Sequence, residues 1–262
     1  MKQLQLVSFI ACITSLTSMA YAQDKILGGK VVTDADLVGK LTVAVVQMTP
    51  GSLSPRDIEG LCSGTLIAKD TVLTAAHCIK GEKPESMRIV FNHNIRAALP
   101  GDFRTVTDMK AHPLRVITPL MIRNDVALIH FEGGLKAGYQ TAPLLPEGTL
   151  VSDGDHVTLA GFGLSSARSS DSAGTLRKVD MTVRQADHKH RQVTFDQTDG
   201  HGACNGDSGG PAFLEKEGTL YAWGVTSYGT GSSCTDIGVY TNASEYPSWV
   251  KHTTARLRKK AD

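Results

Sequence analysis

The chain has 262 residues, and its 27 Lys and Arg nearly balance 26 Asp and Glu, which leaves a formal net charge of +1. This balance argues against nucleic acid as a partner, because phosphate binding requires a strongly basic surface. Hydrophobic residues make up 41% and charged residues 20%, so the chain can bury a core and is not disordered. No apolar run of about 18 residues follows the first twenty-odd positions, so we expect no transmembrane helix in the body of the protein.

Residues 1–22 have the pattern of a signal peptide. Lys2 supplies a positive start, residues 4–16 are mostly apolar, and Ala20-Tyr21-Ala22 is an A-x-A cleavage site. A buried N-terminal helix is the alternative, but Ser and Thr interrupt the apolar run and small residues close it. We therefore expect a secreted protein, either extracellular or periplasmic.

Short runs of alternating or β-branched residues recur along the chain, separated by turns rich in Gly, Pro and Asp. In the first half these runs lie at 41–48, 63–67, 72–75, 88–92, 104–109 and 126–130. A stretch without strand pattern, 133–150, divides the body into two halves. In the second half the runs lie at 157–161, 176–184, 209–214, 220–227 and 238–241. Many short strands with Gly-rich turns predict an all-β sandwich or barrel rather than βαβ units.

The C-terminal segment 246–260 breaks this pattern and predicts an amphipathic helix. Val250 and Leu257 stand seven residues apart, and Pro247 lies near the start. The basic residues at its end suit the negative end of a helix dipole. We interpret them as a solvated helix end rather than a membrane-binding or heparin-binding surface.

The cysteines indicate two disulfides. Cys12 leaves with the signal peptide, and four cysteines remain, an even number that suits an exported chain. Three pairings are possible, and the two local loops favour Cys62 with Cys78 and Cys204 with Cys234. Zinc is the alternative, but no C-x-x-C or H-x-x-x-H spacing supports a metal site.

The strongest chemical signal is the segment 202–211, in which Ser208 stands among glycines. Glycines allow a substrate backbone to come close and let successive N–H groups point at one spot. Ser208 is therefore a candidate nucleophile, which needs a base and an orienting carboxylate. His77 follows a predicted strand and precedes a cysteine, and Asp125 directly precedes an apolar strand, so these two residues are the candidates.

On these residues the chain resembles the trypsin/chymotrypsin-like serine peptidases. The matching blocks are Ile26-Leu27-Gly28-Gly29, Thr74-Ala75-Ala76-His77-Cys78, Asn124-Asp125-Val126-Ala127-Leu128, Gly206-Asp207-Ser208-Gly209-Gly210-Pro211 and Gly238-Val239-Tyr240-Thr241. The resemblance implies two six-stranded antiparallel β-barrels with a C-terminal α-helix and a site between the barrels. The peptidase domain would then span 26–262, with barrels at about 26–135 and 150–245 and the helix at about 246–260.

The resemblance also implies the catalytic roles. Ser208 would attack, His77 would act as base and then acid, and Asp125 would orient His77. The N–H groups of Gly206 and Ser208 would form the oxyanion hole. The chain would then be a serine endopeptidase that works through an acyl-enzyme.

Two alternatives differ in function or fold. An inactive homologue used for binding is the first, although all three triad positions are present. The second is an α/β-hydrolase, since 206–210 also fits G-x-S-x-G. That fold needs Asp and then His after the serine, and only His252 follows, on the predicted terminal helix. The βα alternation is also absent, so we reject it.

Residues 23–25 would form a short activation peptide. The resemblance implies that cleavage after Lys25 frees the amine of Ile26, which would pair with Asp207 beside Ser208. A free amine is largely protonated at neutral pH, since its pKa is about 8. We therefore expect a zymogen that an activating peptidase cleaves.

The resemblance places the substrate pocket at Gly202, Ala203, Gly229 and Gly238, and pairs the substrate backbone with Ser227-Tyr228-Gly229. Ser227 would also support Asp125. Where trypsins have an aspartate, this chain has Gly202, which predicts a neutral pocket for an apolar or aromatic P1 side chain. Asp236 offers an alternative, because its entry into the pocket floor would restore a preference for basic P1 residues.

The expected partners are protein or peptide substrates, the activating peptidase and, as a further candidate, a protein inhibitor. We expect a monomer without cofactor or metal. The stretch 92–96 lacks the acidic pair of the trypsin calcium loop, so calcium is not predicted.

Overall fold

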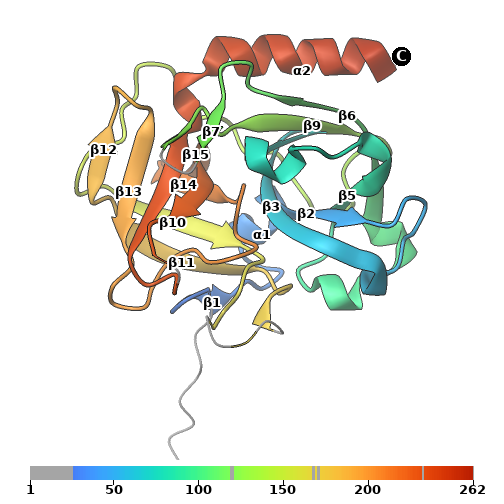
Figure 1. Ribbon diagram of the computed structural model, residues 1–262, viewed down its shortest axis with the longest axis horizontal. Coiled ribbons are helices and arrows are strands. Elements are labelled where there is room, and N and C mark those ends of the chain that lie inside the picture. Colours follow the sequence, from blue (N-terminus) through green and yellow to red (C-terminus); the bar gives the residue numbers. More distant parts are fainter. Residues whose placement is uncertain (1–25, 119–120, 167–168, 170–171, 232, 262) are drawn as a thin grey trace, which may run out of the picture.

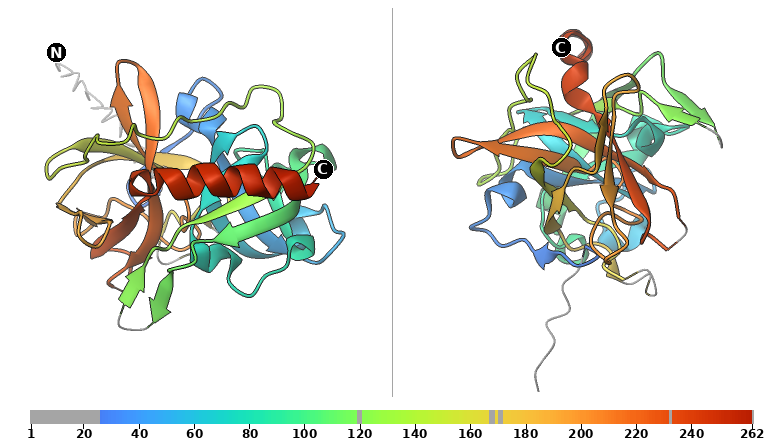
Figure 2. Two further views of the ribbon diagram at one scale, coloured as in Figure 1. Left: turned by 90° about the horizontal axis from the view of Figure 1, so that it is seen from above. Right: turned by 90° about the vertical axis from the view of Figure 1, so that its left-hand side faces the viewer.

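The computed structural model describes residues 26–118, 121–166, 169, 172–231 and 233–261. Two antiparallel β-structures lie side by side, and a long C-terminal helix, α2 (Pro247–Ala261), begins near the second and runs over the first (Figures 1 and 2). The expected signal and activation peptides lie outside the described residues. Within the described ranges, no helix has the length and apolar character needed to cross a membrane.

The first β-structure is a closed barrel of six strands, in the order β2-β3-β4-β9-β6-β5. The strands are β2 (Thr42–Met48), β3 (Ile58–Ala68), β4 (Thr71–Thr74), β5 (Met87–Val90), β6 (Phe103–Ala111) and β9 (Ala127–Phe131). Branched aliphatic side chains alternate into its interior, where Val45, Leu66 and Ile129 are fully buried or nearly so. Each strand overlaps a run predicted from the sequence, because most of these strands are buried along nearly their whole length and are rich in apolar, often β-branched residues.

The second β-structure is an eight-stranded sheet, in the order β1-β11-β10-β14-β15-β16-β13-β12. Its strands are β1 (Lys30–Val31), β10 (His156–Gly161), β11 (Arg177–Thr182), β12 (Gln185–Asp187), β13 (Gln192–Asp196), β14 (Pro211–Lys216), β15 (Thr219–Gly229) and β16 (Ile237–Asn242). Only two residues separate β11 from β12, yet the two strands stand near opposite ends of the sheet. The chain between them spans at most about 11 Å, so the sheet must curl until its ends meet.

The second β-structure is consistent with the expected six-stranded barrel. If β11 and β12 count as one bent strand, β10 to β16 supply the six, and β1 adds a further edge strand from the N-terminal segment. The short strands β1, β12 and β13 had no counterpart in the sequence prediction. Neither had the hairpin of β7 (Val116–Thr118) and β8 (Met121–Arg123), or the short helix α1 (Leu37–Leu41). Most of these elements have only two to five residues, too few for a periodic pattern to stand out unless the run is uniformly apolar.

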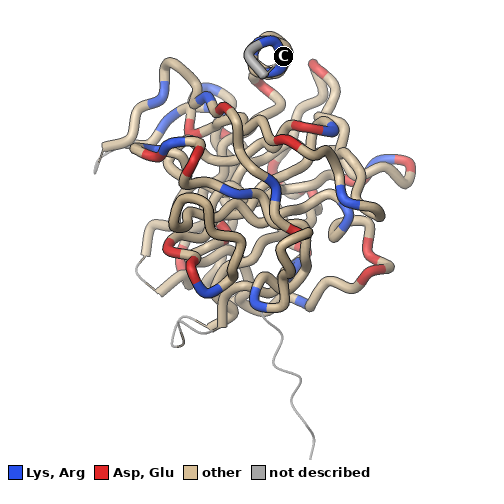
Figure 3. The backbone as a smooth tube through the Cα atoms, turned by 90° about the vertical axis from the view of Figure 1, so that its right-hand side faces the viewer, with Lys and Arg blue, Asp and Glu red and all other residues tan. Residues whose placement is uncertain are grey.

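The two β-structures share an apolar interface. One cluster of buried residues joins Val46 and Val90 of the first barrel to Phe162, Phe213 and Ala222 of the second unit. A close-packed contact of this kind holds the two units in one relative position. On the outside, Lys and Arg positions are interspersed with Asp and Glu over the side shown in Figure 3, in keeping with the near-zero net charge.

Candidate active site

His77 and Asp125 meet because β4 and β9 are neighbours. The antiparallel register pairs Thr74 with Ala127, so the 3₁₀ turn Ala76–Ile79 after β4 lies beside the residues before β9. His77 Nδ1 lies 2.7 Å from Asp125 Oδ2, and the backbone N–H of His77 donates to Asp125 Oδ1 at 2.9 Å. The ring is therefore anchored at Nδ1, which leaves Nε2 as the free nitrogen.

Asp125 has no exposed surface. Burial alone would raise its pKa, but hydrogen bonds and the nearby charge of His77, with the hydroxyl of Ser227, outweigh burial and hold the pKa of Asp125 below its ordinary value. Ser227 Oγ donates to Asp125 Oδ2 at 2.6 Å from the other β-structure. Asp125 is thus an ionised carboxylate fixed by both halves of the molecule.

Asn124 controls the direction in which Asp125 points. Its backbone is left-handed, with φ of 52°, a conformation that Asn tolerates better than most residues. Asn124 Nδ2 donates to the carbonyl of Leu114 at 2.6 Å, and Tyr246 Oη donates to Asn124 Oδ1 at 2.7 Å. The turn before Asp125 is therefore tied to the residue that precedes α2.

Ser208 is half-buried on a loop that the first barrel supports. Ser63 of β3 holds this loop twice: its N–H donates to the Ser208 carbonyl at 2.8 Å, and its Oγ donates to the Gly206 carbonyl at 3.0 Å. Gly206 has φ of 97°, and a Cβ there would lie 2.9 Å from the Cα of Gly163. Only glycine fits this turn without strain.

Two N–H donors remain open beside Ser208. Neither the N–H of Gly206 nor that of Ser208 donates a hydrogen bond to a residue that the structure describes. Backbone N–H groups that point at one spot can bind an anionic oxygen. Both donors are therefore free for the oxyanion-hole role that the resemblance implies.

The segments of His77 and Ser208 touch across the interface. The Sγ of Cys78, the neighbour of His77, lies 3.6 Å from the carbonyl oxygen of Ser208. No hydrogen bond joins His77 to the Ser208 hydroxyl among the described residues, and such bonds often tighten only when substrate is present. The structure therefore brings the three predicted residues to one place, with the His77–Asp125 bond already formed.

Asp207 is buried next to Ser208, with 1% of its surface exposed. Its oxygens accept from the N–H groups of Gly163 at 2.7 Å and Cys204 at 2.8 Å. Burial is the dominant influence and raises the pKa of Asp207 to about 7, because these N–H groups and the more distant Arg177 offset it only in part. No cation in the described part of the chain forms an ion pair with Asp207.

A cavity of about 200 Å³ opens beside Ser208. Of the predicted pocket residues, it is lined by Ala203, Ser227, Tyr228, Gly229 and Gly238. Two residues of the sequence analysis are not there. Gly202 is buried outside the lining, and Asp236 is exposed and also outside it.

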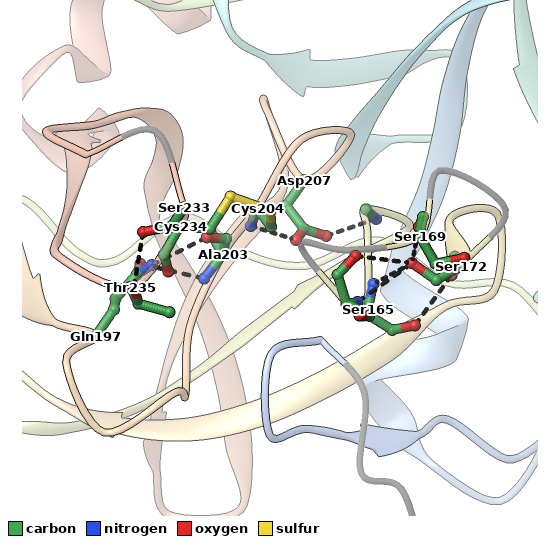
Figure 4. Close-up of a disulfide and its surroundings, with 12 residues drawn as sticks. Ser165, Ser169, Ser172, Gln197, Ala203, Cys204, Asp207, Ser233, Cys234 and Thr235 are labelled. Carbon is green, nitrogen blue, oxygen red and sulfur yellow. Dashed lines mark hydrogen bonds between the residues drawn. A yellow bond between two sulfur atoms is a disulfide. The ribbon is translucent and has the colours of Figure 1, made fainter.

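Gln197 was not predicted, and its side chain packs against two of the predicted pocket glycines, Gly202 and Gly238. It directly follows β13, is 2% exposed and lines the cavity, and Figure 4 shows its side chain beside Ala203 and the Cys204–Cys234 disulfide. Its Nε2 donates to the carbonyls of Ala203 and Cys234. A polar residue directly after an alternating run is the only signal that the sequence offers, and it does not reveal which residues the side chain will meet.

The structure pairs Cys62 with Cys78 and Cys204 with Cys234, the two local loops favoured by the sequence. The first disulfide lies beside His77, and the second joins two segments that line the cavity. The described residues contain one group of metal-capable side chains close together, Cys62, His77 and Cys78. The disulfide occupies both sulfurs, so this group does not offer the thiolates that a metal would need.

Comparison with known proteins agrees with this geometry. A family model described as Trypsin matches residues 42–250, a range that includes His77, Asp125 and Ser208. Brachyurin from Leptuca pugilator is 31% identical over 207 residues, which cover 74% of this chain and 87% of the relative. Trypsin Blo t 3 from Blomia tropicalis is 29% identical over 252 residues, covering 88% and 86%. The chain belongs to the trypsin family of serine peptidases, whose members act on protein or peptide substrates.

A third relative is similar to this chain over only part of its own length. Tissue-type plasminogen activator from Bos taurus is 26% identical over 220 residues, which are 74% of this chain but 39% of that protein. The match therefore covers less than half of that protein. Nothing in this match extends to the rest of the larger protein.

Proposed function

We propose that this protein is a catalytically active serine endopeptidase that hydrolyses peptide bonds through an acyl-enzyme. The observation that carries the proposal is the bonded chain from Ser227 through Asp125 to His77, beside a serine with two open N–H donors. The chain is then a single peptidase domain over 26–262, with barrels at about 26–135 and 150–245 and a terminal helix at about 246–260. It acts as a monomer.

The mechanism follows from the free nitrogen of His77. Nε2 takes the proton of Ser208 Oγ as that oxygen attacks the substrate carbonyl, and the carbonyl oxygen becomes negative in the oxyanion hole of Gly206 and Ser208. Nε2 then gives the proton to the leaving amine, and the C–N bond breaks. A water molecule repeats the cycle, with its proton passing to His77, and releases the acid product and Ser208.

Asp125 makes this cycle possible in two ways. It accepts from Nδ1, which keeps the proton-accepting nitrogen toward Ser208. Its negative charge also stabilises the imidazolium that forms when His77 takes the proton. Because the pKa of Asp125 is held below its ordinary value, the carboxylate stays ionised throughout the neutral range.

The side chain of the P1 residue fits the cavity beside Ser208, and its preference is apolar or aromatic. The described residues that line this cavity carry no carboxylate, and Asp236 is exposed outside it. Burying an apolar P1 side chain contributes about 1.5–3 kcal/mol. A preference for Lys or Arg at P1 would require Asp236 to turn into the cavity.

The protein is secreted as a zymogen that an activating peptidase cleaves after Lys25. Two features support this. Ile26 is 1% exposed and packs in the core of the second β-structure, while the Leu27 carbonyl accepts from the N–H of Gly202 at 3.0 Å. Asp207, buried without a cation among the described residues, is a suitable partner for a new amine. A protein inhibitor is a further partner of the active form.

Peptide-library cleavage read by mass spectrometry tests the proposal. The secreted protein, with Gln23 at its start, is assayed before and after a trace of lysine-specific peptidase, beside its Ser208→Ala and Lys25→Gln variants. We expect cleavage of the library only after Ile26 becomes the N-terminus, and none by Ser208→Ala. Full activity of Lys25→Gln would rule out the zymogen. Folded protein with a free Ile26 that cleaves nothing would favour a binding protein on a peptidase scaffold.

A further inference from the structure

We propose that Gln197 forms the floor of the P1 pocket and restricts it to uncharged side chains. This inference rests on the proposed peptidase function and adds the residue that sets the substrate class. Gln197 directly follows β13 and lines the cavity, whereas Gly202, which the resemblance placed in the pocket, does not.

The amide of Gln197 fills the space between two glycines. A Cβ on Gly202 would lie 2.3 Å from Gln197 Cδ, and a Cβ on Gly238 would lie 2.1 Å from Gln197 Oε1. Neither position can carry a side chain while Gln197 is there. Gly202 and Gly238 therefore do not leave an open floor, because one long side chain from the end of β13 occupies the space that both make available.

Three hydrogen bonds fix the amide in place. Nε2 donates to the carbonyls of Ala203 at 3.0 Å and Cys234 at 2.8 Å, and Oε1 accepts from the N–H of Ala203 at 3.2 Å. These bonds bridge the two segments that the Cys204–Cys234 disulfide also joins (Figure 4). With 2% of its surface exposed, Gln197 is a rigid part of the pocket.

This floor offers no opposite charge to a charged side chain. Both N–H bonds of Nε2 are already used, so a substrate carboxylate finds no donor on Gln197. No Lys, Arg, Asp or Glu is among the described residues that line the cavity. A cationic or anionic P1 group would lose its hydration there without gaining a partner of opposite charge, which is costly. An apolar group has no such penalty.

The variant Gln197→Glu tests the floor with almost no change of shape. It places a carboxylate at the same point, so a cationic P1 group gains a partner. Gln197→Met is the matched control, because it keeps a long unbranched side chain and brings no charge. Both variants lose the two N–H donors, so any effect of that loss alone appears in both.

The first measurement is kcat/KM for peptides that differ only at P1: Phe, Leu, Lys and Asp. We expect the wild type to prefer Phe or Leu over both charged residues. Gln197→Glu should raise the ratio of Lys to Phe by at least about 100-fold, and Gln197→Met should leave it within about fivefold. An unchanged ratio in a folded Gln197→Glu protein would overturn the proposal.

A second measurement does not depend on catalysis. In a Ser208→Ala background with Ile26 freed, binding of benzamidinium, a flat aromatic cation, is measured by calorimetry. Adding Gln197→Glu should tighten binding by at least about tenfold, and adding Gln197→Met should not. Equal affinity in all three proteins would contradict the role of Gln197, whether or not the wild type is a peptidase.

A third variant covers the case in which Gln197→Glu does not fold. Gln197→Ala removes the floor and deepens the cavity, so the ratio of Trp to Leu at P1 should rise by about tenfold. No change in that ratio would overturn the proposal. Labelling of Ser208 by a fluorophosphonate distinguishes failure of the Gln197 proposal from failure of the proposed peptidase function. If Ser208 is labelled but the P1 preference does not change, only the role of Gln197 is rejected. If no protein with a free Ile26 is labelled, the peptidase function is rejected.

Discussion

Asp125 is a fully buried carboxylate, and three hydrogen bonds keep it ionised. Two come from His77, through its backbone N–H and Nδ1, and the third comes from Ser227 Oγ. A buried carboxylate without such donors would take up a proton instead. The hydrogen bond of Ser227 crosses between the two β-structures, so one hydroxyl couples their relative position to the Asp125–His77 pair that we propose as the catalytic base and its partner.

Ser227→Ala removes that hydroxyl. We expect the pKa of Asp125 to rise, because a donor to its ionised form is lost, and kcat/KM to fall by about tenfold. The pH dependence of folding stability follows from the pKa of Asp125, which is lowered in the folded protein. Asp125 stabilises the fold above its unfolded pKa and ceases to do so as pH falls through the folded pKa, so the variant should unfold at a higher pH than the wild type on acidification.

The measurements for Ser227→Ala are the pH–rate profile and an acid-unfolding titration. Ser244→Ala is the control, since Ser244 is a buried serine whose hydroxyl donates to Asn242 and does not touch the triad. Equal kcat/KM for Ser227→Ala and wild type would show that the hydrogen bond from Ser227 Oγ to Asp125 does not affect the reaction.

The C-terminal helix α2 is attached at both ends. Before it begins, Tyr246 donates to Asn124, the neighbour of Asp125. Near its end, Arg258 donates to Asp70 through Nε at 2.8 Å and through the second guanidinium nitrogen at 2.7 Å. Val250 and Leu257, predicted from their spacing, are buried against the first barrel. The element that closes the chain therefore also supports the turn that aims Asp125.

Arg258→Ala should lower the free energy of unfolding by about 1 kcal/mol, because the pair is well aligned but partly exposed. Urea unfolding at low salt measures this. Arg256→Ala, an exposed arginine on the same helix, should have almost no effect. The difference between the two variants should shrink at high salt, which screens exposed pairs. Equal stability of the two variants at low salt would show that the Arg258 contact does not stabilise the protein.

Sequence patterns predicted the long strands because they contain runs of apolar and β-branched residues, and they predicted α2 because its buried residues recur at helical spacing. They missed β13, whose five residues follow the charged turn at 188–191, and the hairpin β7–β8. The triad candidates stand in distinctive local motifs, so the sequence alone is enough to propose them. Gln197 is different, because its role depends on contacts with Ala203 and Cys234, which lie 6 and 37 residues away.

At the scale of the whole molecule, the site exists because two fused β-structures each supply a part. His77 and Asp125 come from the first, Ser208 and Ser227 from the second, and a shared apolar cluster fixes the distance between them. Asp207 lies behind Ser208 as a buried carboxyl without a cationic partner among the described residues. We expect this group to make the stability of the uncleaved protein depend on pH.

The direction in which stability changes with pH follows from the raised pKa of Asp207, which is about 7 in the folded protein against an ordinary value of 3.8. The folded form holds its proton to higher pH than the unfolded form, so its stabilising effect is complete below about pH 4 and is lost as pH rises through 7. In a protein that retains Lys25, the free energy of unfolding measured in urea should fall by up to about 4 kcal/mol between pH 4 and 7.5 because of Asp207.

Asp207→Asn removes this dependence, and Asp196→Asn, at an exposed carboxylate, is the control that keeps it. Cleavage after Lys25 should reverse the loss of stability at rising pH, because the new amine stabilises the ionised form of Asp207. The same pH dependence in wild type and Asp207→Asn would show that another group is responsible.

The most direct test of the whole account is labelling of Ser208 by a fluorophosphonate, before and after cleavage at Lys25, with Ser208→Ala as the blank. Only a serine activated by His77 and facing an oxyanion hole reacts readily with such a reagent. The account predicts label on Ser208 alone, and only once Ile26 is the N-terminus. Folded protein with a free Ile26 that takes no label would contradict it, because the catalytic residues would then not be assembled.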